Sequence, residues 1–252
     1  PFGYGWNFNY GEKLQFRNDF VDFISGDGSY YEFESLGDGT YASPPGTALN
    51  LQQSSSTSPY ELRNTDGSVK IFSLSGRLTE IRDKNGNSLS LIYSAVGQLI
   101  RVEDDAGMFL LFTYTSGRIT RVEDPAGRAN TYSYTDSANL VLRTDAMGNE
   151  YHYSYMTITT PEMAHKISTV ITPLGMYKDY QYSTSLPTKV SKCIVGEYDF
   201  ITNQKTPRYT EYEATYSYPS HTQTKTYGGS ISSAGDITLK IFDKNGVATE
   251  IK

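Results

Sequence analysis

Apolar and polar positions alternate in short runs along this chain, and one arrangement of them returns five times between residues 76 and 182. Apart from a few departures, each copy has apolar residues two and five places after its first residue. An aspartate follows at the eighth place, a glycine at the eleventh and a tyrosine at the eighteenth. The copies cover residues 76–93, 97–114, 117–134, 138–155 and 165–182. A fixed period of this kind indicates a repeat architecture in which each copy is one supersecondary unit.

The fixed positions predict what each copy builds. In chain order they are Asp83, Gly86 and Tyr93; Asp104, Gly107 and Tyr114; Asp124, Gly127 and Tyr134; Asp145, Gly148 and Tyr155; and Gly175 and Tyr182, with Thr172 at the aspartate position. Aspartate followed three residues later by glycine is typical of a turn. The flanking runs of β-branched, aromatic and leucine residues favour strands. A helix would lose about 1 kcal/mol at each interior glycine, so each copy is predicted to be a β-hairpin.

The second strand of each hairpin predicts an aromatic face. Residues two apart share one face of a strand. The eighteenth-place tyrosines therefore lie with the residues at the sixteenth place, which are Leu91, Phe112, Tyr132, Tyr153 and Tyr180. We call positions 16 and 18 of the five copies the tyrosine ladder. Its simplest role is core. The alternative is a surface for another part of a larger protein or for a sugar, with Trp6, Tyr132, Tyr134, Tyr153, Tyr155 and Tyr180 as the candidate stacking residues.

Two copies depart from the pattern. In the fourth copy the apolar residues of the first strand come about one place early, which predicts a bulge or a shifted register there. The fifth copy lacks the leading glycine and the aspartate and follows an insertion that contains Thr159 and Pro161. This copy is expected to be an edge unit or a poorly ordered one.

Three regions are predicted: residues 1–75 ahead of the repeats, the repeats at 76–182, and an irregular β extension at 183–252. Asp27-Gly28 and Asp66-Gly67 predict two hairpins in the first region. Residues 40–59, rich in Ser, Pro and Gly, are expected to form a long exposed loop. Trp6 is expected to be buried at the end of the sheet. In the third region strands are expected over 211–218 and 222–227, and residues 237–246 match the turn half of a sixth copy.

The repeats resemble a known family. The segments GQLIRVEDDAG (97–107) and GRITRVEDPAG (117–127), each followed by its tyrosine, resemble the tyrosine–aspartate (YD) repeats of the Rhs family of bacterial polymorphic toxins. Similar repeats occur in toxin-complex shells and in teneurins. The opening FGYGW (2–6) also resembles a Phe-Gly-x-Gly-Trp segment ahead of the repeats in Rhs proteins. The resemblance covers residues 1–182 well and residues 183–235 poorly.

The resemblance implies an all-β fold in which tandem hairpins form a long, twisted antiparallel sheet that coils into part of a hollow shell. It implies a non-catalytic structural segment of a shell that encapsulates a C-terminal toxin or other cargo. The partners would be the remainder of a longer Rhs-like chain and its cargo domain. The protein would be secreted or located on a bacterial cell surface. The alternative function is a cell-surface module that binds carbohydrate through exposed aromatic residues. Rhs autocleavage at Asp-Pro-x-Gly lies at the far C-terminal end of the shell, so that role is not transferred to Asp124.

Composition and motifs offer little chemistry. The net charge of −6 over 252 residues comes without a basic tract, which argues against nucleic acid as a partner. No apolar run approaches the roughly 20 residues that a membrane-spanning helix needs. The three histidines lack the spacing of metal ligands, and Cys193 is the only cysteine, so no internal disulfide is expected. We expect no enzyme, no cofactor and no metal. A chain that ends within a repeat is expected to be a piece of a longer protein.

Overall fold

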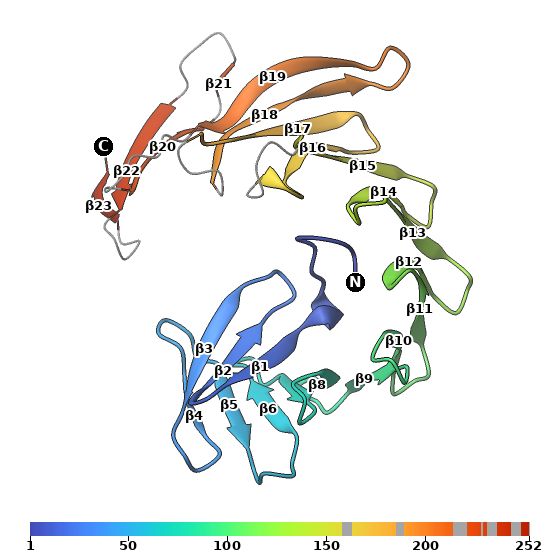
Figure 1. The fold of residues 1–252 in the computed structure, drawn as a ribbon, viewed down its shortest axis with the longest axis vertical. Helices are drawn as coiled ribbons and strands as arrows, with labels where there is room; N and C mark the ends of the chain where they lie inside the picture. Colours follow the sequence, from blue (N-terminus) through green and yellow to red (C-terminus); the bar gives the residue numbers. More distant parts are fainter. Residues whose placement is uncertain are drawn as a thin grey trace. The chain divides into compact units, whose positions relative to one another are not determined.

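The computed structural model shows an all-β chain built from antiparallel hairpins (Figure 1). It describes residues 1–157, 163–184, 189–213, 221–227, 229–230, 236–242 and 248–251, and beyond residue 213 its backbone only. The chain forms two units, 1–132 and 133–252, and each is treated separately below.

The first unit holds one short helical turn and thirteen strands, the last of which crosses into the second unit. These are η1 (Asn9–Gly11), β1 (Lys13–Arg17), β2 (Phe20–Ile24), β3 (Tyr30–Ser35), β4 (Tyr41–Ala42), β5 (Asn50–Gln53), β6 (Tyr60–Arg63), β7 (Val69–Phe72), β8 (Leu78–Arg82), β9 (Ser88–Tyr93), β10 (Leu99–Asp104), β11 (Phe109–Thr115), β12 (Arg118–Glu123) and β13 (Ala129–Tyr134). Strands β1–β4 form one sheet, and β5 to β13 follow one another in a second sheet in chain order.

Strands β1 to β8 close into a ring. An isolated bridge pairs Thr40 with Gln52 on one side, and a second pairs Lys13 with Arg77 on the other. Eight large side chains fill the ring, each at most 4% exposed: Leu14, Val21, Phe23, Phe33, Leu51, Leu62, Phe72 and Leu78. Burying an aliphatic or aromatic side chain contributes about 1.5–3 kcal/mol, so this core anchors the unit. Strand β8 belongs both to the ring and to the first repeat, which places the repeats on a folded base.

A glycine lies at each of the two seams of the ring. The carbonyl of Gly39 accepts the N–H of Gln53 at 2.7 Å, and the carbonyl of Gly76 accepts the N–H of Leu14 at 2.7 Å. The φ angle is +86° at Gly39 and +79° at Gly76. A Cβ at either position would lie 2.2 Å from the partner's carbonyl oxygen. Only a residue without a side chain allows the strands to approach this closely.

The second unit continues with strands in chain order. They are β14 (Leu140–Thr144), β15 (Glu150–Tyr155), β16 (Ile167–Ile171), β17 (Met176–Tyr182), β18 (Val190–Asp199), β19 (Gln204–Glu213), β20 (His221–Tyr227), β21 (Gly229–Ser230), β22 (Asp236–Phe242) and β23 (Ala248–Ile251). Strands β14 to β19 are neighbours in sequence order, β21 pairs with β19, and β20, β22 and β23 form a separate three-stranded sheet.

The hairpin prediction is confirmed in all five copies, as β8–β9, β10–β11, β12–β13, β14–β15 and β16–β17. The two earlier hairpins are confirmed as β2–β3 and β6–β7. The boundaries expected after residues 75 and 182 stay predictions.

Three expectations from the sequence are wrong. Residues 40–59 are not one exposed loop, because β4 and β5 lie there and Leu51 is fully buried in the ring. The fourth copy keeps the common register: Leu142 pairs with His152 as Arg101 pairs with Leu111. The fifth copy is not at an edge, since β18 pairs along the whole of β17.

The third region contains more regular structure than its sequence indicates. Strands β18 and β19 are a hairpin of ten residues on each side. The predicted strand over 222–227 is confirmed as β20, while that over 211–218 is described only to Glu213. Thr159, Pro161 and the turn at 243–246 lie outside the described residues.

Candidate functional site

The central turn of every repeat has the same hydrogen bonds. The glycine N–H donates to the carbonyl at the aspartate position, and the N–H at that position donates to a carbonyl four residues later, from Asp83–Asn87 through Thr172–Met176. The five turn glycines have φ between +76° and +91°. This is a type I turn followed by a left-handed residue, a common three-residue hairpin loop. The same bonds recur at Gly28 and Gly67, outside the repeats.

The aspartate side chains hold these turns. Asp104 Oδ1 accepts the N–H groups of Ala106 at 2.9 Å and Met108 at 2.8 Å. Asp83, Asp124 and Asp145 accept the equivalent pairs of N–H groups. Bonds from the Arg128 side chain and then from the backbone lower the pKa of Asp124, and the Asn149 side chain and the backbone do the same at Asp145. The aspartates therefore act as turn formers.

The first place of each copy is in the left-handed region whatever residue occupies it. Gly76, Gly97 and Gly117 have φ between +77° and +82°, but Ala138 has +71° and His165 has +64°. Residues with a Cβ are strained in this region by roughly 1–2 kcal/mol. The geometry of the repeat is thus imposed on two copies whose sequence opposes it.

The repeat tyrosines connect three strands. The hydroxyls of Tyr93, Tyr114, Tyr155 and Tyr182 donate to the carbonyls of Leu78, Leu99, Leu140 and Ile167, at 2.7–3.0 Å. Each acceptor lies fifteen residues earlier, at the third place of the tyrosine's own copy. Tyr93 also pairs across the strands with Leu99, the third-place residue of the next copy, beside a bulge. A hydrogen bond in this setting contributes about 0.5–1.5 kcal/mol to the tyrosine's own hairpin. The backbone pairing of Tyr93 with Leu99 links that hairpin to the next.

The ladder face is more buried than its reverse. In the second strand of the second copy Phe112 is 7% exposed, whereas Leu111 on the other face is 39% exposed. The ladder tyrosines are half-buried in every copy. Burial raises the pKa of Tyr93 to about 12 and also raises the pKa of Tyr114, Tyr180 and Tyr182. The ladder face is thus the side of the strands turned toward the core.

In the first unit the N-terminal segment covers the ladder. The ring of Phe2 lies 5.0 Å from Phe8 and 4.7 Å from Tyr132, and Phe8 and Tyr10 approach Phe112 at 6.3 and 6.4 Å between centroids. The carbonyl of Pro1 accepts the N–H of Ile119 at 3.0 Å, which ties the segment to β12. Aromatic pairs at these separations contribute about 0.5–1.5 kcal/mol beyond their buried area. Residues 1–12 are therefore a lid on the first three repeats.

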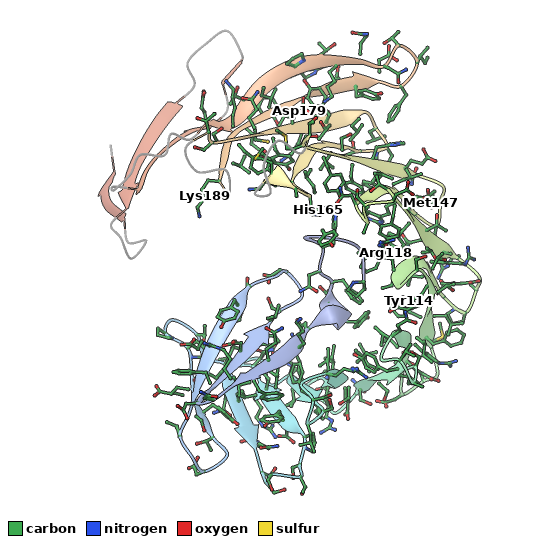
Figure 2. All side chains as sticks on the ribbon, viewed as in Figure 1. Tyr114, Arg118, Met147, His165, Asp179 and Lys189 are labelled. Atoms are coloured by element: carbon green, nitrogen blue, oxygen red, sulfur yellow. The ribbon has the colours of Figure 1, made fainter. Side chains whose placement is uncertain are left out.

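The lid corrects one expectation. Phe2, at 8% exposed, is its buried aromatic residue, whereas Trp6 is half-buried. The candidate stacking residues do not gather at one place: Trp6 and Tyr132 belong to the first unit, while Tyr134, Tyr153, Tyr155 and Tyr180 follow the strands of the second, all half-buried. Ligand stacking by these residues stays a prediction. Figure 2 shows the side chains along the hairpins, with Tyr114 on the ladder face of β11 and Met147 at the β14–β15 turn.

Comparison with known proteins gives a limited picture. No family model matches the chain, and no curated protein matches it. Among solved structures, it is similar to a crystal structure of TcdB2-TccC3 without the hypervariable C-terminal region, with 12% identity, a TM-score of 0.38, and coverage of 93% of this chain and 16% of that one. A second structure of TcdB2-TccC3 has 12% identity and a TM-score of 0.40, covering 90% of this chain and 16% of that one. Likeness at this level assigns neither a family nor a function.

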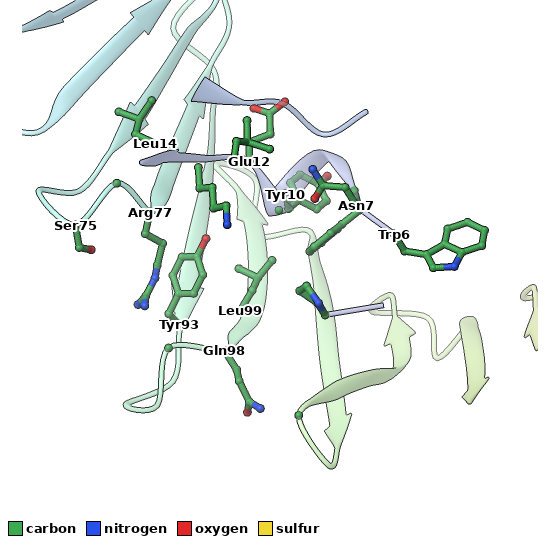
Figure 3. A pocket seen from close by; sticks show the side chains of 18 of the residues that line it. Trp6, Asn7, Tyr10, Glu12, Leu14, Ser75, Arg77, Tyr93, Gln98 and Leu99 are labelled. Atoms are coloured by element: carbon green, nitrogen blue, oxygen red, sulfur yellow. The ribbon is translucent and has the colours of Figure 1, made fainter. Parts of the chain in front are cut away.

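A groove lies between the lid and the first three repeats (Figure 3). It has a volume of about 630 Å³ and lies entirely within the first unit. One wall is the lid and the start of β1. The other is formed by the turns that precede β8, β10 and β12, with Gly76, Gly97 and Gly117 at equivalent places. The aromatic and polar side chains that line it are Trp6, Asn7, Phe8, Tyr10, Glu12, Lys13, Ser75, Arg77, Tyr93, Gln98 and Tyr114. Volumes of 300–1,000 Å³ are typical of small-molecule sites.

Sequence reasoning missed this groove and its cations. Lys13 lies 64 positions from Arg77 in the chain, and no local pattern brings the two together. The structure pairs them directly opposite each other between β1 and the start of β8. The only signal in the sequence was the repeat period itself, which aligns Arg77, Gln98 and Arg118 at the second place of three successive copies.

Other candidate chemistry is weak in the described part of the chain. There, no group of three or more His, Cys, Asp or Glu side chains could hold a metal ion. Cys193 is buried, and burial together with the Glu211 carboxylate raises the pKa of its thiol to about 12. A thiol of this kind is a poor nucleophile at neutral pH. Among the described residues, no helix has the length and apolar character needed to cross a membrane.

Proposed function

We propose that this chain is a non-catalytic structural segment of a YD-repeat shell of the Rhs type, whose work is to enclose a toxin or another cargo. The observation that carries the proposal is the tyrosine linkage, in which a hydroxyl at place 18 bonds the carbonyl at place 3 of the same copy. It gives the recurring tyrosine a structural role: the hydroxyl closes its own hairpin, while the backbone of the same residue, as at Tyr93, pairs with the next copy. This role needs no reactive group.

The turns support the same role. Their aspartates are engaged by backbone N–H groups, as at Asp104, where two such groups bond one carboxylate oxygen. A carboxylate used in this way is poorly placed for acid–base chemistry on a substrate. The arginines at the fifth place of the second and third copies are paired within their own strands, Arg101 with Glu103 at 2.8 Å and Arg121 with Glu123 at 2.9 Å. The repeat positions are thus occupied by structural bonds.

The proposal places the natural protein outside the cell or on a bacterial surface, with the remainder of a longer chain and its cargo domain as partners. An adhesion module that stacks sugars on the ladder is the other candidate. It has less support, because the ladder tyrosines are half-buried and four of their hydroxyls bond the backbone.

Limited proteolysis of the natural full-length protein tests the proposal. If the repeats enclose cargo, a segment outside residues 1–252 should survive protease while the shell is intact. It should be degraded when the same segment is expressed alone. A double variant, Tyr155→Phe with Tyr182→Phe, removes the hydroxyl bonds of two hairpins and should increase cleavage. Equal cleavage of every segment in the intact protein would contradict enclosure.

A further inference from the structure

The groove of the first unit contains two cations without a carboxylate partner. Lys13 and Arg77 are both exposed, and within the described residues neither forms an ion pair. The nearby acid, Glu12, is 8% exposed and is already paired with Lys70 at 2.6 Å. Most arginines of this unit, by contrast, form an ion pair with a glutamate or an aspartate.

The backbone places the two cations opposite each other. Residues directly opposite each other in an antiparallel pair place their side chains on the same face, about 4.5–5.5 Å apart at Cβ. Like charges in this arrangement are destabilising. Lys13 and Arg77 occupy such a pair at the seam of the ring, where the strands make few other contacts. An anion bound between them would remove the repulsion.

Arg77 is also held in place. Its guanidinium lies over the ring of Tyr93, 4.7 Å from the centroid, and a Cβ on Gly97 would be only 2.6 Å from Arg77 Nη2. Tyr93 is fixed in turn by its bond to the Leu78 carbonyl. An arginine that is fixed by stacking, with its donors unpaired, loses little entropy when it binds a carboxylate in a bidentate manner. Figure 3 shows Arg77 beside Tyr93, with Gln98 on the next turn.

The rest of the groove has the character of a sugar site. Aromatic rings can contact the C–H faces of a sugar ring, and Tyr93 and Tyr114 line the groove together with Phe8. Gln98 on the next turn also lines the groove and carries a side-chain amide, with both donors and an acceptor. A mostly apolar cavity with a few polar groups at one end is typical of small-ligand sites. Aromatic rings, an amide and two cations together fit a ligand that has C–H faces, hydroxyls and one acidic group.

We propose that this groove binds an acidic saccharide, whose carboxylate lies between Lys13 and Arg77 and whose ring lies on the aromatic side toward Gln98. The site shares Tyr93 and Tyr114 with the ladder. It goes beyond the shell role, since a wall segment needs no ligand. Its success or failure leaves the proteolysis test of the shell unchanged.

Tryptophan fluorescence tests the site directly, because Trp6 is the only tryptophan of the chain and lines the groove. The 252-residue chain is titrated with a glucuronate-containing disaccharide, with cellobiose as the neutral counterpart and with tetraglutamate as an acidic peptide. We expect saturable binding of the acidic disaccharide, at least tenfold tighter than that of cellobiose or tetraglutamate.

Variants separate the site from general charge effects. Arg77→Gln and Lys13→Gln should each weaken binding several-fold, and the double variant should weaken it at least tenfold. Arg101→Gln removes an equal charge from a paired arginine of the second copy and should leave the affinity unchanged. Any of three results would overturn the proposal: no binding up to 10 mM, equal binding of cellobiose or tetraglutamate, or an equal loss in the Arg101 variant. Circular dichroism of each variant confirms that it is folded.

Discussion

The repeats of the two units share one geometry but use different residues on the ladder face. At place 16 the first unit has Leu91 and Phe112, 6% and 7% exposed, and the lid accounts for part of that burial. Its last place-16 residue, Tyr132, is half-buried beside Phe2 of the lid. The second unit has Tyr153 and Tyr180 at this place, both half-buried. Tyrosine can keep its hydroxyl in contact with water while its ring packs, whereas leucine and phenylalanine cannot. Hydrogen bonding of the turns and of the eighteenth-place tyrosine thus builds the strip, and place 16 is adapted to what covers it.

The largest expected difference between the units is at place 16. Phe112→Ala should lower the free energy of unfolding by about 3–5 kcal/mol, since it empties a covered core position. Tyr153→Ala removes a ring of similar size from a half-buried position and should cost about half as much. Equilibrium urea denaturation of the two variants measures both values. Equal losses would show that the two ladder faces are equally covered.

The next contrast concerns the seam of the ring. Gly76 and Gly117 have φ of +79° and +77°, so alanine at either position adds strain of about 1–2 kcal/mol. At Gly117 a Cβ meets nothing within 4 Å, but at Gly76 it meets the Leu14 carbonyl at 2.2 Å. Gly76→Ala should therefore destabilise the chain by a further 1–3 kcal/mol, the usual cost of overpacking. Equal melting temperatures for the two variants would mean that the seam can open without loss.

A smaller effect, of opposite sign, is expected in the second unit. Ala138 has φ of +71° at a place where other copies have glycine. Ala138→Gly should raise the free energy of unfolding by about 0.5–1 kcal/mol, because the relief of strain exceeds the lost methyl contact and the added flexibility of the unfolded chain. Ala126→Gly, at a turn position outside the left-handed region, is the control and should destabilise slightly. A loss at Ala138 would indicate that its methyl group is needed for packing.

The last effect depends on pH. Because the pKa of Tyr93 is raised to about 12 in the folded chain, against about 10 in an unfolded one, its contribution to stability is complete below pH 10. That contribution is lost as the pH rises from 10 to 12. Tyr93→Phe should consequently flatten the fall in stability over this interval. Tyrosinate absorbance at 295 nm should lose a component that titrates near pH 12.

Much of the repeat could be predicted from sequence because its determinants are local. Aspartate and glycine three residues apart specify a turn, and alternation specifies the faces of Phe112 and Leu111. The ring could not be predicted, because its seams join residues far apart in the chain, such as Leu14 and Gly76. Leu51 lies in a stretch whose Ser, Pro and Gly content favours a loop, and tertiary packing in the ring overrides that preference. The lid was recognised as a motif, but not as the cover of Phe112.

The account rests on the claim that the repeats form the wall of an enclosure. Cryo-electron microscopy of the natural full-length protein tests it most directly. We predict that hairpins β14–β15 and β16–β17 belong to a longer strip in which other hairpins have the same tyrosine linkage. The faces of Tyr153 and Tyr180 should point into a closed cavity that holds another segment of the chain. A map in which these tyrosines face bulk solvent, or in which no cavity forms, would contradict the account.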